Sequence, residues 1–194
     1  MAFIEPISLT GQHVALEPLS LEHEAALAEA VRDGELWKLW FTAIAAPEKM
    51  HDYILAALQM REQGAMPFVV RDLRTGKIVG TTRLFNVDAK HRRLEIGYTW
   101  YAASVQRSAI NTESKKLLLT HAFESLHCIA VEFRTSWMNQ RSRAAIARLG
   151  AKQDGVLRSH QLHADGSLRD TVVFSITTAE WPTVKKHLQF KLGE

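Results

Sequence analysis

One stretch of this chain decides its fold: Glu95-Ile-Gly-Tyr-Thr-Trp-Tyr101, followed by the polar residues Gln106-Arg-Ser-Ala-Ile-Asn-Thr112. It predicts a strand, a short polar loop and a helix over about 112–125, capped by Asn111 or Thr112. The first N–H groups of a helix have no partner inside it, and the helix dipole makes that end positive, so a phosphate is its natural ligand. The alternative is a plain helix cap, with Lys115 on the first turn as a solvated cation.

Apolar periodicity extends the prediction in both directions from this stretch. The predicted strands are 13–18, 66–72, 78–86, 94–101, 129–135, 152–163 and 169–176, the last two joined by a turn at 164–167. The first predicted helix begins with Ser20 as its cap. The others span 47–63, 112–125, 139–149 and 178–188, and residues 34–41 are expected to form one helical turn and a loop. Strand–helix–strand units in the middle predict parallel pairing there, and hairpins elsewhere predict antiparallel pairing. We expect a mixed α+β fold with helices on both faces of the sheet.

Composition narrows the class of protein. The chain has 194 residues, 46% of them hydrophobic and 23% charged, and a net charge of +3, with no linker or repeat, so residues 1–194 are expected to form one globular domain. The small charge does not favour nucleic-acid binding, and no apolar run approaches the roughly 20 residues that span a membrane. No signal peptide is expected at the N-terminus.

Cysteine and histidine usage excludes two further kinds of site. The single Cys128 cannot form an internal disulfide, so we expect a cytoplasmic protein. We interpret Cys128 as a buried structural thiol, the alternative being a nucleophile. No histidine has metal-ligand spacing to cysteines or carboxylates, so no metal is predicted.

Four segments together resemble a known family: Gly80-Thr-Thr-Arg-Leu84 with the turn Asn86-Val-Asp88, Leu94-Glu-Ile-Gly-Tyr98, the loop from Gln106 to Thr112, and Asn139-Gln-Arg-Ser142 with the later Arg148-Leu-Gly-Ala151. In this order and at these spacings they resemble the GCN5-related N-acetyltransferase (GNAT) superfamily, and within it the RimJ/RimL type of ribosomal-protein N-terminal acetyltransferase. The resemblance implies a mostly antiparallel sheet with one splayed parallel pair. It also implies acetyl-CoA as co-substrate and an amine as acceptor.

The resemblance assigns a phosphate loop. The family pattern Gln/Arg-x-x-Gly-x-Gly/Ala falls on Gln106, Ala109 and Asn111, so neither glycine is present. Side-chain donors are expected to replace the backbone N–H groups that glycines would bring close to the phosphates. These donors are the Asn111 amide and the Thr112 hydroxyl, with Lys115 or Arg107 to neutralise the phosphate charge. The implied phosphate-binding residues are therefore Gln106, Arg107, Ser108, Ala109, Ile110, Asn111, Thr112 and Lys115.

The family also pairs the strand before this loop with the pantetheine arm of CoA through main-chain contacts, like an added strand. This assigns pantetheine to Thr99, Trp100 and Tyr101. The alternative for the two aromatic residues is core packing, and a backbone contact allows both.

Two residues are the candidate catalytic groups. Glu95 matches the family position for a base that takes the amine proton, directly or through water; the alternative is a strand carboxylate paired with Arg92 or Arg93. Asn139 is expected to cap a helix and, by resemblance, to bond the amide chain of CoA. Ser142, on the same helix face, is the candidate donor to the leaving sulfur, the alternative being local capping. The family's usual acid position, near Ile146, holds no hydroxyl.

The acceptor is not fixed by the sequence. The family places a loop over the acceptor amine where Trp37, Trp40 and Phe41 lie; core packing is the alternative. The leading function is acetylation of a protein or peptide α-amine. The others are acetylation of a small amine, such as a polyamine, amino acid or antibiotic, and CoA binding without catalysis. A homodimer is the candidate assembly. A negatively charged acceptor cleft would favour polycationic amines.

Overall fold

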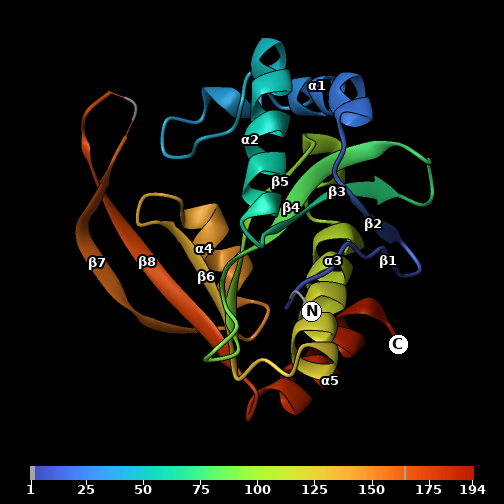
Figure 1. The fold of residues 1–194 in the computed structure, drawn as a ribbon, viewed down its shortest axis with the longest axis vertical. Coiled ribbons are helices and arrows are strands. Elements are labelled where there is room, and N and C mark those ends of the chain that lie inside the picture. Colours follow the sequence, from blue (N-terminus) through green and yellow to red (C-terminus); the bar gives the residue numbers. More distant parts are fainter. Residues whose placement is uncertain (1–2, 164) are drawn as a thin grey trace.

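The eight strands of the described residues form one sheet, in the order β1-β2-β3-β4-β5-β6-β8-β7 (Figure 1). The computed structural model describes residues 3–163 and 165–194. The strands are β1 (Leu9–Thr10), β2 (Val14–Pro18), β3 (Met66–Asp72), β4 (Ile78–Asp88), β5 (Arg93–Tyr101), β6 (Ala130–Ser136), β7 (Lys152–Leu162) and β8 (Leu168–Thr177). The α-helices are α1 (Glu24–Arg32), α2 (Met50–Glu62), α3 (Ala109–Thr120), α4 (Gln140–Ala147) and α5 (Trp181–Leu192).

The predicted mixed fold is confirmed. Every neighbouring pair of described strands is antiparallel except β5 and β6, which are parallel. β3 has the predicted bounds, and β1 was not predicted. α5 begins three residues later and ends four residues later than the predicted terminal helix. In the turn between β7 and β8, Ala164 lies outside the described residues. In the described chain no helix is both long and apolar enough to cross a membrane.

Helices cover both faces of the sheet (Figure 1). One buried cluster joins α1 and α2 to the sheet, through side chains such as Leu27, Ile54 and Val69. The other joins α3, α4 and α5 to the opposite face, through side chains such as Leu118, Ile146 and Leu188. We call these the α2 face and the α3 face. Strand side chains alternate between them, because successive residues point to opposite sides of a sheet.

The parallel pair is short. β5 and β6 are in register only at Arg93↔Ala130, Leu94↔Val131 and Glu95↔Glu132. Beyond this point β6 continues to pair with β8 as far as Ser136, while β5 continues with β4. From Ile96 onward, the edge of β5 that faces β6 therefore has no strand partner among the described residues. We call this divergence the splay.

A bulge in β5 lies within the splay. Thr81 pairs with Trp100 but Arg83 pairs with Gly97, so Tyr98 and Thr99 together oppose Thr82. Tyr98 adopts the left-handed conformation, with φ 50°. An extra residue of this kind re-aims the side chains that follow it. Tyr98 consequently lies on the α2 face over Arg83, while Thr99 bonds to Lys115 of α3.

A buried carboxylate fastens α3 to the turn between β1 and β2. Glu113 is 2% exposed and accepts backbone N–H bonds from Gln12, His13 and Val14 at 2.8, 2.7 and 2.9 Å. These donors come from about 100 residues earlier in the chain. Gly11 leaves room for this contact, because a Cβ there would lie 2.4 Å from the Glu113 carboxyl carbon. The start of α3 is thereby held in place from the edge of the sheet.

Candidate active site

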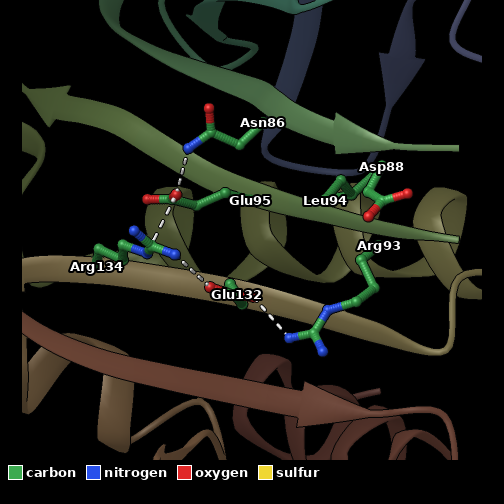
Figure 2. Close-up of a pocket in the computed structure, with 7 residues that line it drawn as sticks. All are labelled: Asn86, Asp88, Arg93, Leu94, Glu95, Glu132 and Arg134. Atoms are coloured by element: carbon green, nitrogen blue, oxygen red, sulfur yellow. Dashed lines mark hydrogen bonds and ion pairs between the residues drawn. The ribbon is translucent and has the colours of Figure 1, made fainter. Parts of the chain in front are cut away.

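Glu95 lies at the last paired position before the splay. Its side chain is buried, and Oε2 accepts a hydrogen bond from Asn86 Nδ2 at 2.9 Å and faces Arg134 Nε at 3.5 Å (Figure 2). The alternative pairing of Glu95 with Arg92 or Arg93 does not occur; Arg93 donates instead to Glu132 at 2.6 Å. Asn86 has φ 46°, a left-handed conformation that asparagine tolerates well and that places its amide over β5.

The surroundings of Glu95 favour proton uptake. Burial raises the pKa of this carboxyl, and the Asn86 hydrogen bond and the Arg134 charge offset the rise only in part. Glu132 also raises the pKa, and Arg169 lowers it. A base works best when its pKa lies near the operating pH, so the direction of this shift suits an amine deprotonation.

A pocket of about 200 Å³ adjoins this carboxylate (Figure 2). It is lined by Asn86, Asp88, Arg93, Leu94, Glu95, Glu132 and Arg134. Arg134 donates to Glu132 at 3.0 Å while also facing Glu95, so a single guanidinium connects the two carboxylates that are in register across β5 and β6. Asn86 was expected only as part of a family-like turn, and neither it nor Arg134 was predicted to belong to the site. The alternation of β6 already placed Glu132 and Arg134 on one face, but only the register shows that this face adjoins Glu95.

The loop before α3 differs from the prediction in its cap. α3 begins at Ala109, and its N-cap is Ser108, whose Oγ accepts from the Ile110 N–H at 3.3 Å. Asn111 and Thr112 are inside the helix and do not cap it. The left-handed residue of the loop is Arg107, with φ 63°. Because Ala109 and Asn111 are helical, neither position needs a glycine, which explains how the loop forms without the family's two glycines.

The side chains predicted for phosphate divide into two groups. Gln106, Arg107 and Ser108 are exposed, Ala109 and Asn111 are half-buried, and Ile110, Thr112 and Lys115 are buried. Lys115 is not the solvated cation of the alternative interpretation, because it is buried and its ammonium donates to the Thr82 and Thr99 hydroxyls at 3.0 and 2.6 Å. Burial lowers its pKa to about 7. Gln106 donates to the Tyr101 carbonyl at 2.9 Å, which joins the loop to the end of β5.

The residues predicted for pantetheine lie on the strand edge that the splay leaves without a partner. Trp100 and Tyr101 are 5% and 8% exposed and pack into the cores of the α2 face and the α3 face, respectively. Thr99 bonds to Thr82 and Lys115 through its hydroxyl. Core packing is thus correct for the two aromatic side chains. An unpartnered strand edge is also a template for an added extended ligand, so the backbone prediction is compatible with it.

Asn139 and Ser142 stand on the other side of the splay. α4 follows β6, and Asn139 caps it by accepting the Ser142 N–H at 3.0 Å. The predicted cap is therefore present, and Ser142 lies half-buried in the first turn. Ile146 is buried in the core of the α3 face, which accounts for an apolar residue at the position where other family members carry the acid.

The aromatic residues before α2 were predicted either to cover the acceptor amine or to pack in the core, and they differ in their surroundings. Trp37 packs against the core of the α2 face. Trp40 is 58% exposed, and its ring lies 5.7 Å from Phe41 and 5.3 Å from His163 at the end of β7. This segment therefore reaches across to the β7–β8 hairpin.

Two other candidate chemistries find no support. Cys128 is 1% exposed, and burial raises its pKa to about 11, so the thiol is structural. Within residues 3–163 and 165–194, no group of three or more His, Cys, Asp or Glu side chains could hold a metal ion.

Comparison with known proteins decides the family. A family model described as an acetyltransferase (GNAT) domain matches residues 13–152, which contain the splay, Glu95, the α3 loop and Ser142. The chain belongs to the GNAT acetyltransferase family. This confirms the resemblance drawn from the sequence. Family members use acetyl-CoA as the acetyl donor.

Individual relatives agree with this assignment. A Bacillus subtilis (strain 168) protein, provisionally named ribosomal N-acetyltransferase YdaF, is 34% identical over 109 residues, which are 56% of this chain and 58% of that protein. A provisionally assigned acetyltransferase from T. thermophilus has a TM-score of 0.86 at 34% identity, over 97% of this chain and 98% of its own. RimJ of Mycobacterium smegmatis, solved with CoA-disulfide, shares the fold with a TM-score of 0.81 at 23% identity, over 97% and 95% of the two chains.

Proposed function

We propose that this GNAT protein, acting as one domain over residues 1–194, transfers the acetyl group of acetyl-CoA to the α-amine of a protein or peptide N-terminus. The observation that carries the proposal is the placement of Glu95, a buried carboxylate of raised pKa, at the residue where β5 and β6 diverge. The name of the YdaF relative supports a ribosomal or similar protein as the acceptor.

The chain offers suitable contacts for CoA. The N–H groups that open α3 and the exposed Arg107 can hold phosphates, and the β6-facing edge of β5 can pair with the amide groups of pantetheine. Asn139 can contact the same amide chain from α4. CoA bound in this way supplies a thioester whose carbonyl can be attacked by an amine.

Glu95 and Ser142 act on the two sides of that reaction. Glu95 takes a proton from the incoming ammonium, so that the neutral amine can attack. The Ser142 hydroxyl donates to the sulfur as the thiolate leaves. Asn86 and Arg134 orient the Glu95 carboxylate toward this task.

The other two functions are less well supported. A polyamine is attracted by a uniformly negative surface, whereas the pocket beside Glu95 mixes the carboxylates of Asp88 and Glu132 with the guanidiniums of Arg93 and Arg134. A binding module without catalysis has no use for a buried carboxylate of raised pKa. An enzyme with a peptide acceptor agrees with both observations.

A turnover screen tests the proposal. Acetyl-CoA is incubated with unmodified N-terminal peptides, with the same peptides blocked at the α-amine, and with small amines, and CoA release is measured. We expect release with free α-amines only. In parallel, CoA at 100 times its dissociation constant should stabilise the fold by about 2.7 kcal/mol, and NAD and ATP much less. Turnover with small amines alone would contradict the peptide acceptor, and an unchanged melting curve would contradict CoA binding.

Two variants test the mechanism. We expect Glu95→Gln to lower kcat by about 10²–10⁴-fold, most severely at low pH, where the protonated amine dominates. We expect Ser142→Ala to lower kcat with little change in CoA affinity, because its hydroxyl acts on the leaving group. If Glu95→Gln keeps the wild-type pH–rate profile, Glu95 is a structural carboxylate; if Ser142→Ala keeps the wild-type kcat, another group is the acid.

A further inference from the structure

Among the described residues, Arg83 is a buried cation without a counter-charge. Its side chain is 3% exposed and stacks on the Tyr98 ring, with its central carbon 4.0 Å from the ring centroid. Nη1 contacts the Met60 sulfur at 2.8 Å, and the buried Nε has no hydrogen-bond partner. The described residues place no carboxylate within 4.0 Å of this guanidinium. Buried charges are normally paired, so an unpaired one calls for a reason.

Arg169 shows the same deficit on the other side of Glu95. Its Nη1 donates to Gln161, but its buried Nε has no partner, and no described carboxylate forms an ion pair with it. Arg169 is half-buried and lies on β8, two residues before Thr171. The pair Ser136↔Thr171 is the last one between β6 and β8, so Arg169 has no pairing partner on β6. Its charge acts on Glu95. Arg169 thus faces the region that β6 leaves open.

These cations lie apart from the predicted phosphate site. Arg83 points to the α2 face, where it meets Tyr53 and Met60 of α2. Its neighbour Thr82 points the other way, to Lys115 of α3. The helix start that would hold the CoA phosphates belongs to α3. The phosphates therefore do not supply the missing negative charge on the α2 face.

We propose that the acceptor supplies this missing negative charge: the substrate is an acidic N-terminus, with Asp or Glu as its first or second residue. Arg169 binds this carboxylate, and the buried Arg83, on the strand next to that of Glu95, adds positive charge to the same part of the sheet. A guanidinium holds a carboxylate through charged N–H bonds, and the half-buried Arg169 leaves part of its side chain open to a ligand. The α-amine then lies at Glu95. This inference rests on the proposed acetylation of peptide α-amines and names the acceptor class.

The test uses peptides that differ in one charge. Wild-type enzyme is assayed with peptides that carry Asp or Asn, and Glu or Gln, at position one or two, beside otherwise identical neutral sequences. We expect a kcat/KM about 10- to 100-fold higher for the acidic member of a pair, the range of charged hydrogen bonds. Arg169→Gln should remove this preference, and Arg169→Lys should restore part of it. Arg158→Gln is the matched control, because Arg158 lies on the same hairpin but is paired with Asp170.

The outcomes separate this inference from the proposed function. Equal rates for acidic and neutral peptides would overturn the inference while leaving peptide acetylation intact. A preference that survives Arg169→Gln would overturn the role of Arg169. Turnover of free aspartate or glutamate without turnover of any peptide would overturn both. Should Arg169→Gln fail to fold, the comparison of Asp with Asn peptides on the wild-type enzyme still decides the acidic preference.

Discussion

Arg134 is the residue that couples the two carboxylates of the site. It faces Glu95 at 3.5 Å and donates to Glu132 at 3.0 Å, and Arg93 holds Glu132 from the other side at 2.6 Å. Glu132 is thus doubly neutralised, whereas Glu95 has one hydrogen bond from an uncharged amide and a share of one cation. Burial therefore raises the pKa of Glu95, and the Asn86 hydrogen bond and the Arg134 charge offset this rise only in part.

We therefore expect Arg134→Gln to move the acidic limb of the pH–rate profile to higher pH. The Arg134 charge lowers the pKa of Glu95, so its removal raises that pKa, and the carboxylate form needed as a base then appears only at higher pH. The measurement is kcat/KM against pH for one confirmed acceptor. Arg93→Gln is the control, because Arg93 contacts Glu132 and not Glu95. An unshifted limb in Arg134→Gln would show that Glu95 is not the titrating base.

Lys115 should make the free energy of unfolding increase with pH. Its pKa in the fold is about 7, against 10.5 for the free side chain, so between these values the unfolded chain binds more protons. The free energy of unfolding therefore rises with pH over this window. Between pH 7 and 9 the wild type should gain about 2 kcal/mol relative to Lys115→Met. Urea unfolding of both proteins at the two pH values tests this, with the exposed Lys90→Met as control; parallel pH dependences would contradict it.

These residue-level contacts show where sequence reasoning ends. Glu95 and Ser142 could be singled out because motif positions are local in the chain. The pairing of Glu95 with Arg134 could not be predicted. The two residues are 39 positions apart in the chain, and they meet because β5 and β6 pair in parallel over three residues. Lys115 was predicted on the first turn of a helix that begins near 112, but α3 begins at Ala109, so Lys115 is its seventh residue. Its burial and its bonds to Thr82 and Thr99 follow from the tertiary packing of α3.

At the scale of elements, the bulge in β5 determines which side chains reach which face. Next to the bulge, β4 and β5 approach each other at Gly80 more closely than a residue with a Cβ permits. A Cβ added to Gly80 would lie 2.1 Å from the Trp100 carbonyl oxygen, which belongs to rigid strand backbone. Trp100 is also within the segment predicted to pair with pantetheine. The fit of these two strands therefore affects both stability and CoA binding.

We expect Gly80→Ala to lower the free energy of unfolding by about 1–3 kcal/mol, the usual cost of overpacking, and to weaken CoA binding. Denaturant unfolding and CoA titration measure the two effects. Gly155→Ala in β7 is the matched control, because a Cβ there meets nothing within 4 Å. Equal stability of the two variants would mean that the strands separate at little cost.

Most elements were predictable because their signals are local. Alternation located β3 and β6, and Asn139 marked the start of α4. β1 was missed because its two residues carry no periodic pattern. The cap of α3 was placed three to four residues too late because Asn111 and Thr112 are also good capping residues, and only the structure shows Ser108 making the bond.

At the scale of the whole molecule, the sheet consists of two antiparallel parts joined by a short seam. β1 to β5 form one part and β6, β8 and β7 the other, with three register pairs between them (Figure 1). The order of strands and helices predicted this parallel pair. It could not predict how short the seam is, because the divergence of two strands depends on which neighbour each of them follows.

The Glu113 contact makes the turn before β2 a remote reporter of cofactor binding. Its three backbone amides are held by a side chain on the first turns of the helix that would receive the phosphates. CoA should suppress fraying of that helix, and deuterium should then enter the amides of Gln12, His13 and Val14 more slowly. Mass-spectrometric exchange with and without CoA measures this, and Glu113→Gln should abolish the difference. Unaltered exchange at these amides in the wild type would show that the edge of the sheet is insulated from the ligand.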